Sequence, residues 1–215
     1  METRRIAAAV VVSGALALAF PGAAAAQNRC ATYKIKAAAK KQYCIAKEYA
    51  HAAQSNAAPQ QDDIDACEAK FAGTYTKLDL KGGCITTGDA GAIEAKVDAF
   101  VADLVIELDS GSPSRCQSYK IIAASKKAKC LLVLEAKEAR YGQPIDPLKF
   151  QRCRDKFAAK FAGLEAQYNC DTNGDAAVIE AKVDAFVEDV VNELPATTTT
   201  TTETTTTTES TTTLP

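Results

Sequence analysis

The sequence has no tryptophan, one histidine and one methionine among 215 residues, and aromatic side chains make up only 7% of it. Bulky apolar side chains are what fill a deep core, so this alanine-rich chain is expected to bury only a thin core in each domain. The single histidine, His51, has a lysine, Lys137, as its counterpart 86 residues later, which is the offset at which the sequence repeats. We therefore interpret His51 as a solvated helix residue, and we expect no catalytic residues and no enzymatic activity.

The sequence also lacks an excess of basic charge. The net charge is −2 and the isoelectric point is about 5.6, which excludes the overall basic footprint of a nucleic-acid-binding protein. The sequence has neither a Cys-x-x-Cys motif nor closely spaced Cys and His pairs, so it lacks the usual redox and zinc signatures. We expect no metal and no cofactor.

The N-terminus has the pattern of a secretory signal peptide. Arg4 and Arg5 precede an apolar run over residues 6–20, and Ala24-x-Ala26 provides a small-residue cleavage site. A retained membrane anchor would need about 20 apolar residues, and this run has only about 15 before the first proline. We expect removal of residues 1–26, no transmembrane segment in the mature chain, and a secreted, periplasmic or cell-surface protein.

Four cysteines recur at a constant offset along the chain. Shifting the sequence by 86 positions superimposes the first set on the second, and both sets have spacings of 14, 23 and 17. The run IEAKVDAFV also occurs twice at this offset, beginning at Ile93 and Ile179. The chain is therefore a tandem duplication. We expect unit 1 at residues 27–108, a turn-rich linker at 109–114, and unit 2 at 115–195.

The apolar residues of each unit recur at helical spacing. The second segment of unit 1 places them three or four positions apart, at Ile64, Cys67, Phe71, Tyr75 and Leu78. The first segment is rich in alanine and lysine without glycine or proline, and the third is amphipathic. The fold class is all-α, with two tandem disulfide-stapled three-helix bundles. The threonine-rich tail, residues 196–215, is expected to be disordered or, if glycosylated, an extended stalk.

Disulfides are the expected use of the cysteines in an exported protein. In an antiparallel pair of helices, facing residues have position numbers with a nearly constant sum, which is 111 for Cys44 with Cys67 and 114 for Cys30 with Cys84. A bond between Cys30 and Cys44 would have to bridge about 21 Å along one helix. The corresponding pairs of unit 2 are Cys116 with Cys170 and Cys130 with Cys153.

A short threonine and aspartate motif precedes the third segment of each unit. It resembles a capping box, in which a threonine begins the helix and a carboxylate follows three residues later. The expected cap residues are Thr86, Asp89, Thr172 and Asp175. In unit 2 the motif also resembles the start of a calcium loop. Ala176 stands where that loop requires glycine and Lys182 where it requires glutamate, so we favour capping.

Lysines gather on the first segment of each unit, whereas acidic residues gather on the third. One interpretation is an anion-binding strip for a polysaccharide, a lipid headgroup or a nucleic acid. The alternative, which we favour, is two solvated faces of opposite charge that attract each other weakly. The candidate strip consists of Lys34, Lys40, Lys41, Lys120, Lys126 and Lys127.

The pattern Tyr-Lys-x-x-Ala-Ala-x-Lys-Lys-x-x-Cys, followed by Lys-Phe-Ala and by Thr-x-Gly-Asp-Ala-x-x-Ile-Glu-Ala-Lys-Val-Asp-Ala-Phe-Val, resembles an uncharacterised family. The resemblance covers residues 30–195. It is to alanine- and lysine-rich four-cysteine repeats that we associate with exported proteins of delta-group proteobacteria, and it implies bacterial export without implying an activity.

The leading functional hypothesis is a non-catalytic structural or interaction module of the cell envelope, with an envelope protein or polysaccharide as its partner. The alternative is a carrier that holds a small apolar ligand between its helices. A carrier needs a surplus of large apolar residues facing inward, which the alanine-rich composition disfavours.

Overall fold

The structure is a computed structural model that describes residues 21–109, 111–112, 114–168 and 170–195. The tail and most of the expected signal peptide lie outside these residues. The described chain is all-helical, as expected, with three helices from each unit. The helices are α1 (Pro21–Ser55), α2 (Gln61–Lys81), α3 (Ala90–Glu107), α4 (Arg115–Tyr141), α5 (Pro147–Gln167) and α6 (Ala176–Glu193).

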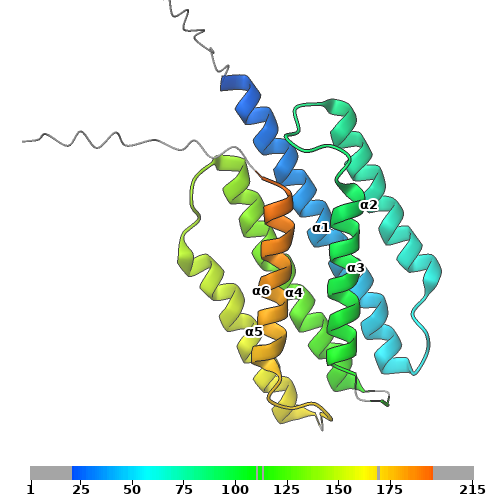
Figure 1. The fold of residues 1–215 in the computed structure, drawn as a ribbon. Coiled ribbons are helices and arrows are strands. Elements are labelled where there is room, and N and C mark those ends of the chain that lie inside the picture. The colour runs from blue at the N-terminus through cyan, green and yellow to red at the C-terminus, as the bar shows by residue number, and fades with distance from the viewer. Residues whose placement is uncertain (1–20, 110, 113, 169, 196–215) are drawn as a thin grey trace, which may run out of the picture.

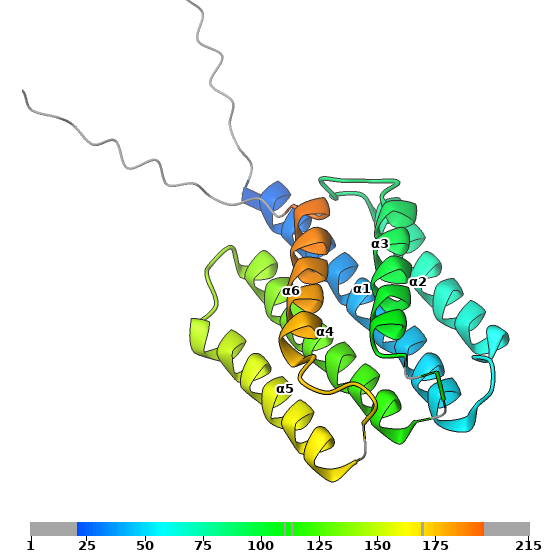
Figure 2. The ribbon, with the colours of Figure 1, turned by 60° about the horizontal axis from the view of Figure 1, so that its bottom comes forward.

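The six helices form two layers (Figure 1). Helices α2, α1, α4 and α5 lie side by side in one layer, and α3 and α6 pack together over α1 and α4 (Figure 2). The two units are thus joined both through α1 with α4 and through α3 with α6. As a result, one apolar core extends through both units.

Helix boundaries follow local chemistry. The hydroxyl of Ser114 accepts a hydrogen bond from the backbone of Gln117 at the start of α4, and Asp146 caps α5 in the same way, next to Pro147. Helix α4 ends at Tyr141 and is followed by Gly142, whose φ of 62° is the left-handed conformation that glycine adopts most readily.

Each unit contains two nested disulfides. Cys30 is bonded to Cys84, and Cys44 to Cys67. Unit 2 repeats this arrangement with Cys116–Cys170 and Cys130–Cys153. These are the pairs that the antiparallel hairpin geometry predicts. Together they connect the first helix of each unit to its second helix and to the loop that follows. Four such bonds indicate an oxidising environment.

Helices α1 and α4 run antiparallel along the centre of the protein. The Ser114 amide donates to the Ala53 carbonyl at 2.9 Å, and the Gln42 side chain donates to the Ser125 carbonyl at 3.0 Å. Small side chains allow two helix axes to approach closely. Alanines of both helices that are at most 2% exposed are Ala38, Ala39, Ala46, Ala50, Ala124, Ala128 and Ala136.

The contact between α3 and α6 is self-complementary. Phe100 stacks on Phe186, its own counterpart 86 residues later, with ring centroids 4.2 Å apart. Ion pairs cross the same interface reciprocally: Lys96 pairs with Glu193, and Lys182 with Glu107. Contacts between equivalent residues are typical of a two-fold symmetric dimer. Within one molecule, α3 and α6 therefore form the kind of interface that a homodimer would form.

Candidate functional site

The most unusual feature of the interior is a set of four buried lysines, two in each unit. Lys34, Lys41, Lys120 and Lys127 are each at most 2% exposed. An ammonium group removed from water is strongly unfavourable unless opposite charges and hydrogen-bond acceptors surround it. Each of these lysines has such a set of partners.

Lys34 lies inside a cage built from α2 and the loop before α3. Its Nζ atom is 2.7 Å from a carboxylate oxygen of Asp79, pairs with Asp89, and donates to the Thr86 carbonyl at 2.8 Å. The ring of Tyr75 lies beneath it, with the centroid 5.2 Å away. Burial by itself raises the pKa of Asp79, but hydrogen bonds from Lys34 and the Gly88 amide hold it below its usual value.

Unit 2 repeats this cage around Lys120. Its Nζ atom is 2.7 Å from both Glu165 and Asp175, and it donates to the Thr172 carbonyl at 2.8 Å. Phe161 takes the place of the tyrosine, with its ring centroid 5.1 Å away. Burial favours a raised pKa for Asp175, but hydrogen bonds from Lys120 and Thr172 lower it. Each unit therefore contains a buried ion cluster beside the loop that precedes its third helix.

The second lysine of each unit pairs with the start of the third helix. Lys41 contacts Glu94 at 2.7 Å and Asp98 at 2.9 Å, and the phenyl ring of Phe71 lies beside it. Lys127 contacts the equivalent acids, Glu180 and Asp184, each at 2.8 Å. These ion pairs join α1 to α3 and α4 to α6.

The anion-binding strip therefore needs correction. Only Lys40 and Lys126 of its six lysines are exposed, whereas Lys34, Lys41, Lys120 and Lys127 face inward toward acids of the same chain. The attraction between basic and acidic helices does exist, but for these four lysines it acts in the interior rather than between solvated surfaces.

The sequence does not reveal which acids pair with the four buried lysines, because those acids come from other helices and loops than the lysines. A signal for the lysines was present: Lys34 and Lys41 are seven residues apart and so share one helix face, and this face also carries Ala38 and Ile45. The same holds for Lys120 and Lys127. A lysine at core spacing, repeated in both units, indicates a buried ion pair.

The expected capping boxes also differ from the structure. Helix α3 begins at Ala90 and α6 at Ala176, so Thr86 and Thr172 lie outside the helices rather than at their first residues. Asp89 and Asp175 occupy the N-cap positions but form no side-chain capping bond. Instead, Asp89 accepts from the Thr86 hydroxyl at 2.6 Å and pairs with a buried lysine. A buried ammonium without an acidic partner is strongly unfavourable, so the Asp89 carboxylate pairs with Lys34 rather than capping the helix.

Three carboxylates of unit 1 also meet near Lys41. Oxygen atoms of Glu68, Glu94 and Asp98 lie within 4.8 Å of one another. The Lys41 ammonium already contacts two of them, and unit 2 has Arg154 in place of the third. This arrangement is an internal ion cluster of the scaffold. His51 is exposed on α1, as expected for a solvated residue.

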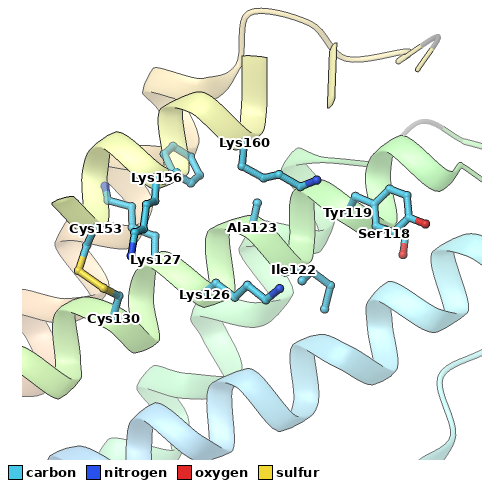
Figure 3. Close-up of a pocket in the computed structure, with 11 residues that line it drawn as sticks. Ser118, Tyr119, Ile122, Ala123, Lys126, Lys127, Cys130, Cys153, Lys156 and Lys160 are labelled. Atoms are coloured by element: carbon cyan, nitrogen blue, oxygen red, sulfur yellow. A yellow bond between two sulfur atoms is a disulfide. The ribbon is translucent and has the colours of Figure 1, made fainter. Parts of the chain in front are cut away.

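A groove of about 500 Å³ lies between α4 and α5. We call it the α4/α5 groove. Its eleven lining residues all come from these two helices (Figure 3): Ser118, Tyr119, Ile122, Ala123, Lys126, Lys127, Cys130, Cys153, Lys156, Phe157 and Lys160. None of them is acidic. Lys126, from the predicted strip, is the only exposed strip residue that lines it. Ligand pockets of proteins are commonly of this size and largely apolar.

No family model, curated protein or solved structure matches the chain. Among the described helices, none is long and apolar enough to cross a bilayer.

Proposed function

We propose that the chain is a non-catalytic exported module of the cell envelope, which acts as a scaffold or binds a partner. The observation that carries this proposal is the commitment of its reactive groups to internal structure. All eight cysteines form disulfides, and the four buried lysines are paired with acids of the chain. Stabilising disulfides are expected in a small domain that must remain folded in an oxidising environment.

Cleavage of a signal peptide after Ala26 belongs to the proposal. It would leave Cys30, the first buried side chain that the structure describes, in the mature chain. Helix α1 extends back to Pro21, and the mature helix would begin at Gln27. Membership of the four-cysteine repeat family of exported bacterial proteins belongs to the same proposal.

The two units are joined into a single body. A shared core and reciprocal ion pairs hold the units together, so duplication does not produce two flexibly linked binding sites. The outer surfaces of α2 and α5 instead lie at opposite edges of one body (Figure 1). A partner would therefore meet two related surfaces at a fixed separation.

A second candidate function is the carrier of a small apolar ligand. The α4/α5 groove favours it, because its volume and its largely apolar lining match those of ligand sites. The groove lies between α4 and α5, the helix at the edge of the layer (Figure 1).

Mass spectrometry of the exported protein under native and then denaturing conditions tests both candidates. The scaffold or interaction module is expected to appear as a bare chain that begins at Gln27 and is lighter by eight hydrogens than its reduced form, two for each disulfide. Extra mass that disappears on denaturation would establish a bound ligand and favour the carrier. A chain that retains residues 1–26 or free thiols would contradict export and oxidation.

A further inference from the structure

We infer that the α4/α5 groove binds a single-chain anionic amphiphile, with its alkyl chain in the groove and its anionic group among the lysines at the rim. This inference rests on the carrier function proposed above and adds the chemical class of the ligand and its site. The groove offers two distinct chemical environments, an apolar floor and a cationic rim.

The floor of the groove is apolar. It includes Ala123, Phe157 and the disulfide between Cys130 and Cys153, all from neighbouring turns of α4 and α5. Ile122 adds a half-buried aliphatic side chain. Transfer of an alkyl chain from water to such a surface is favourable in proportion to the apolar area that it buries. A fully hydrophilic ligand would leave this floor without a partner.

The rim is cationic. Lys126 on α4 and Lys156 and Lys160 on α5 are exposed and approach the groove from its two sides (Figure 3). Within the described part of the chain, Lys126 and Lys156 have no carboxylate partner, and Lys160 lies over the ring of Tyr119 at 5.9 Å. The fourth lysine of the lining, Lys127, is neutralised by two internal acids.

Rim and floor together select the ligand. Lysine side chains extend over apolar surface while their ammonium groups stay in water, which suits a ligand with an anionic end and an aliphatic body. The groove is partly open to solvent, and its size suits one alkyl chain. Charge complementarity supplies the anionic requirement, since the lining contributes lysines and no acid.

Unit 1 provides an internal control. At the positions of Ile122 and Lys160 it has Lys36 and Thr74, so both the floor and the rim are changed. Two rim lysines are nevertheless retained in unit 1 at equivalent positions, as Lys40 and Lys70. If binding needs the whole groove, unit 2 binds the amphiphile and unit 1 does not.

The test uses the exported, oxidised full chain, freed of any copurified ligand. Isothermal titration calorimetry with dodecanoate, below its micelle concentration, is expected to show one site per chain. Dodecanol and acetate serve as the neutral and the chainless probes, and both should bind at least about tenfold more weakly. Replacing Lys126 and Lys156 together by alanine should weaken dodecanoate binding about tenfold, because two exposed charges that attract the carboxylate are lost and each contributes modestly.

The matched variant replaces Lys40 and Lys70 of unit 1 by alanine and should leave the affinity unchanged. Ile122→Lys, which introduces the residue of unit 1, should abolish dodecanoate binding while circular dichroism shows an intact fold. Equal losses in both lysine variants, or equal affinity for dodecanol, would overturn the anionic site.

The carrier function can fail separately. If native mass spectrometry finds a copurified ligand but dodecanoate does not bind, the inference is wrong and the carrier stands. If neither is observed, both are wrong.

Discussion

Removal of one buried lysine should destabilise the protein far more than removal of an exposed lysine from the same helix. Lys120→Met retains the aliphatic stem and deletes the ammonium, so little cavity forms and the change is mainly electrostatic. It leaves Glu165 and Asp175, both 2.7 Å from the Nζ atom, without their cation, and the Thr172 carbonyl without its donor.

The magnitude follows from burial. Breaking a buried ion pair by removing one partner costs about 3–5 kcal/mol. The Lys120 side chain is fully buried, but those of Glu165 and Asp175 are 21% and 13% exposed, so water can partly solvate the abandoned acids. We therefore expect a loss near the lower end, about 3 kcal/mol, out of a total free energy of unfolding of about 5–15 kcal/mol. Lys126→Met, at an exposed position six residues further along α4, should change stability by less than about 0.5 kcal/mol.

The loss should depend on pH. The pKa of Asp175 is lowered in the folded protein, so this group stabilises the fold above its unfolded pKa of about 3.9, and the stabilisation disappears as pH falls through the folded pKa. In Lys120→Met the burial remains but the lysine is gone, which raises the pKa of Asp175 and lets the acid become neutral earlier. The difference between variant and wild type should therefore shrink below about pH 4.

Urea unfolding of the oxidised protein, followed by circular dichroism near neutral pH and again at about pH 3, measures this difference. Lys120→Met should unfold at a lower urea concentration near neutral pH, and the gap should narrow at the lower pH. The reasoning is refuted if Lys120→Met and Lys126→Met unfold at the same urea concentration, or if the gap is equal at the two pH values.

Three further predictions concern the disulfides, the interface between the units and the proposed signal peptide. Replacing Cys44 and Cys67 together by serine should lower the free energy of unfolding by about 3 kcal/mol, against about 4 for the outer disulfide with its longer loop, as measured by urea unfolding. Phe100→Ala and Phe186→Ala should each cost about 3 kcal/mol, and a double-mutant cycle should give a coupling of about 1 kcal/mol; additive losses would contradict direct stacking. N-terminal sequencing of the exported protein should begin at Gln27, and any other start would place the cleavage site elsewhere.

Much of the fold could be predicted from the sequence because helices and their partners within a unit are set by local patterns. Apolar residues three or four positions apart predict each amphipathic helix, and the spacing of Cys44 and Cys67 fits a short antiparallel hairpin. Because the pattern recurs 86 residues later, the same prediction holds for unit 2, where α5 and α6 have the same lengths as α2 and α3.

The candidate sites were harder to predict, because a side chain's role depends on what faces it. Lys40 and Lys41 are adjacent and chemically identical, yet one is exposed and the other is buried against Glu94 and Asp98. Asp89 could serve equally well as a helix cap or as a counter-ion, and only the position of Lys34 settles which. The α4/α5 groove likewise combines residues from two helices whose separation no local pattern specifies.

The sequence by itself determined the helices, the duplication and the cysteine framework, since each depends on spacing along one chain or within one hairpin. Only the tertiary structure decided that the two units share a core, that four lysines lie inside it, and that the groove in unit 2 combines an apolar floor with a cationic rim. These features depend on the free energy of packing helices from distant parts of the chain. A buried charged group must be paired, so each one pairs with the opposite charge that the packing of the helices places next to it.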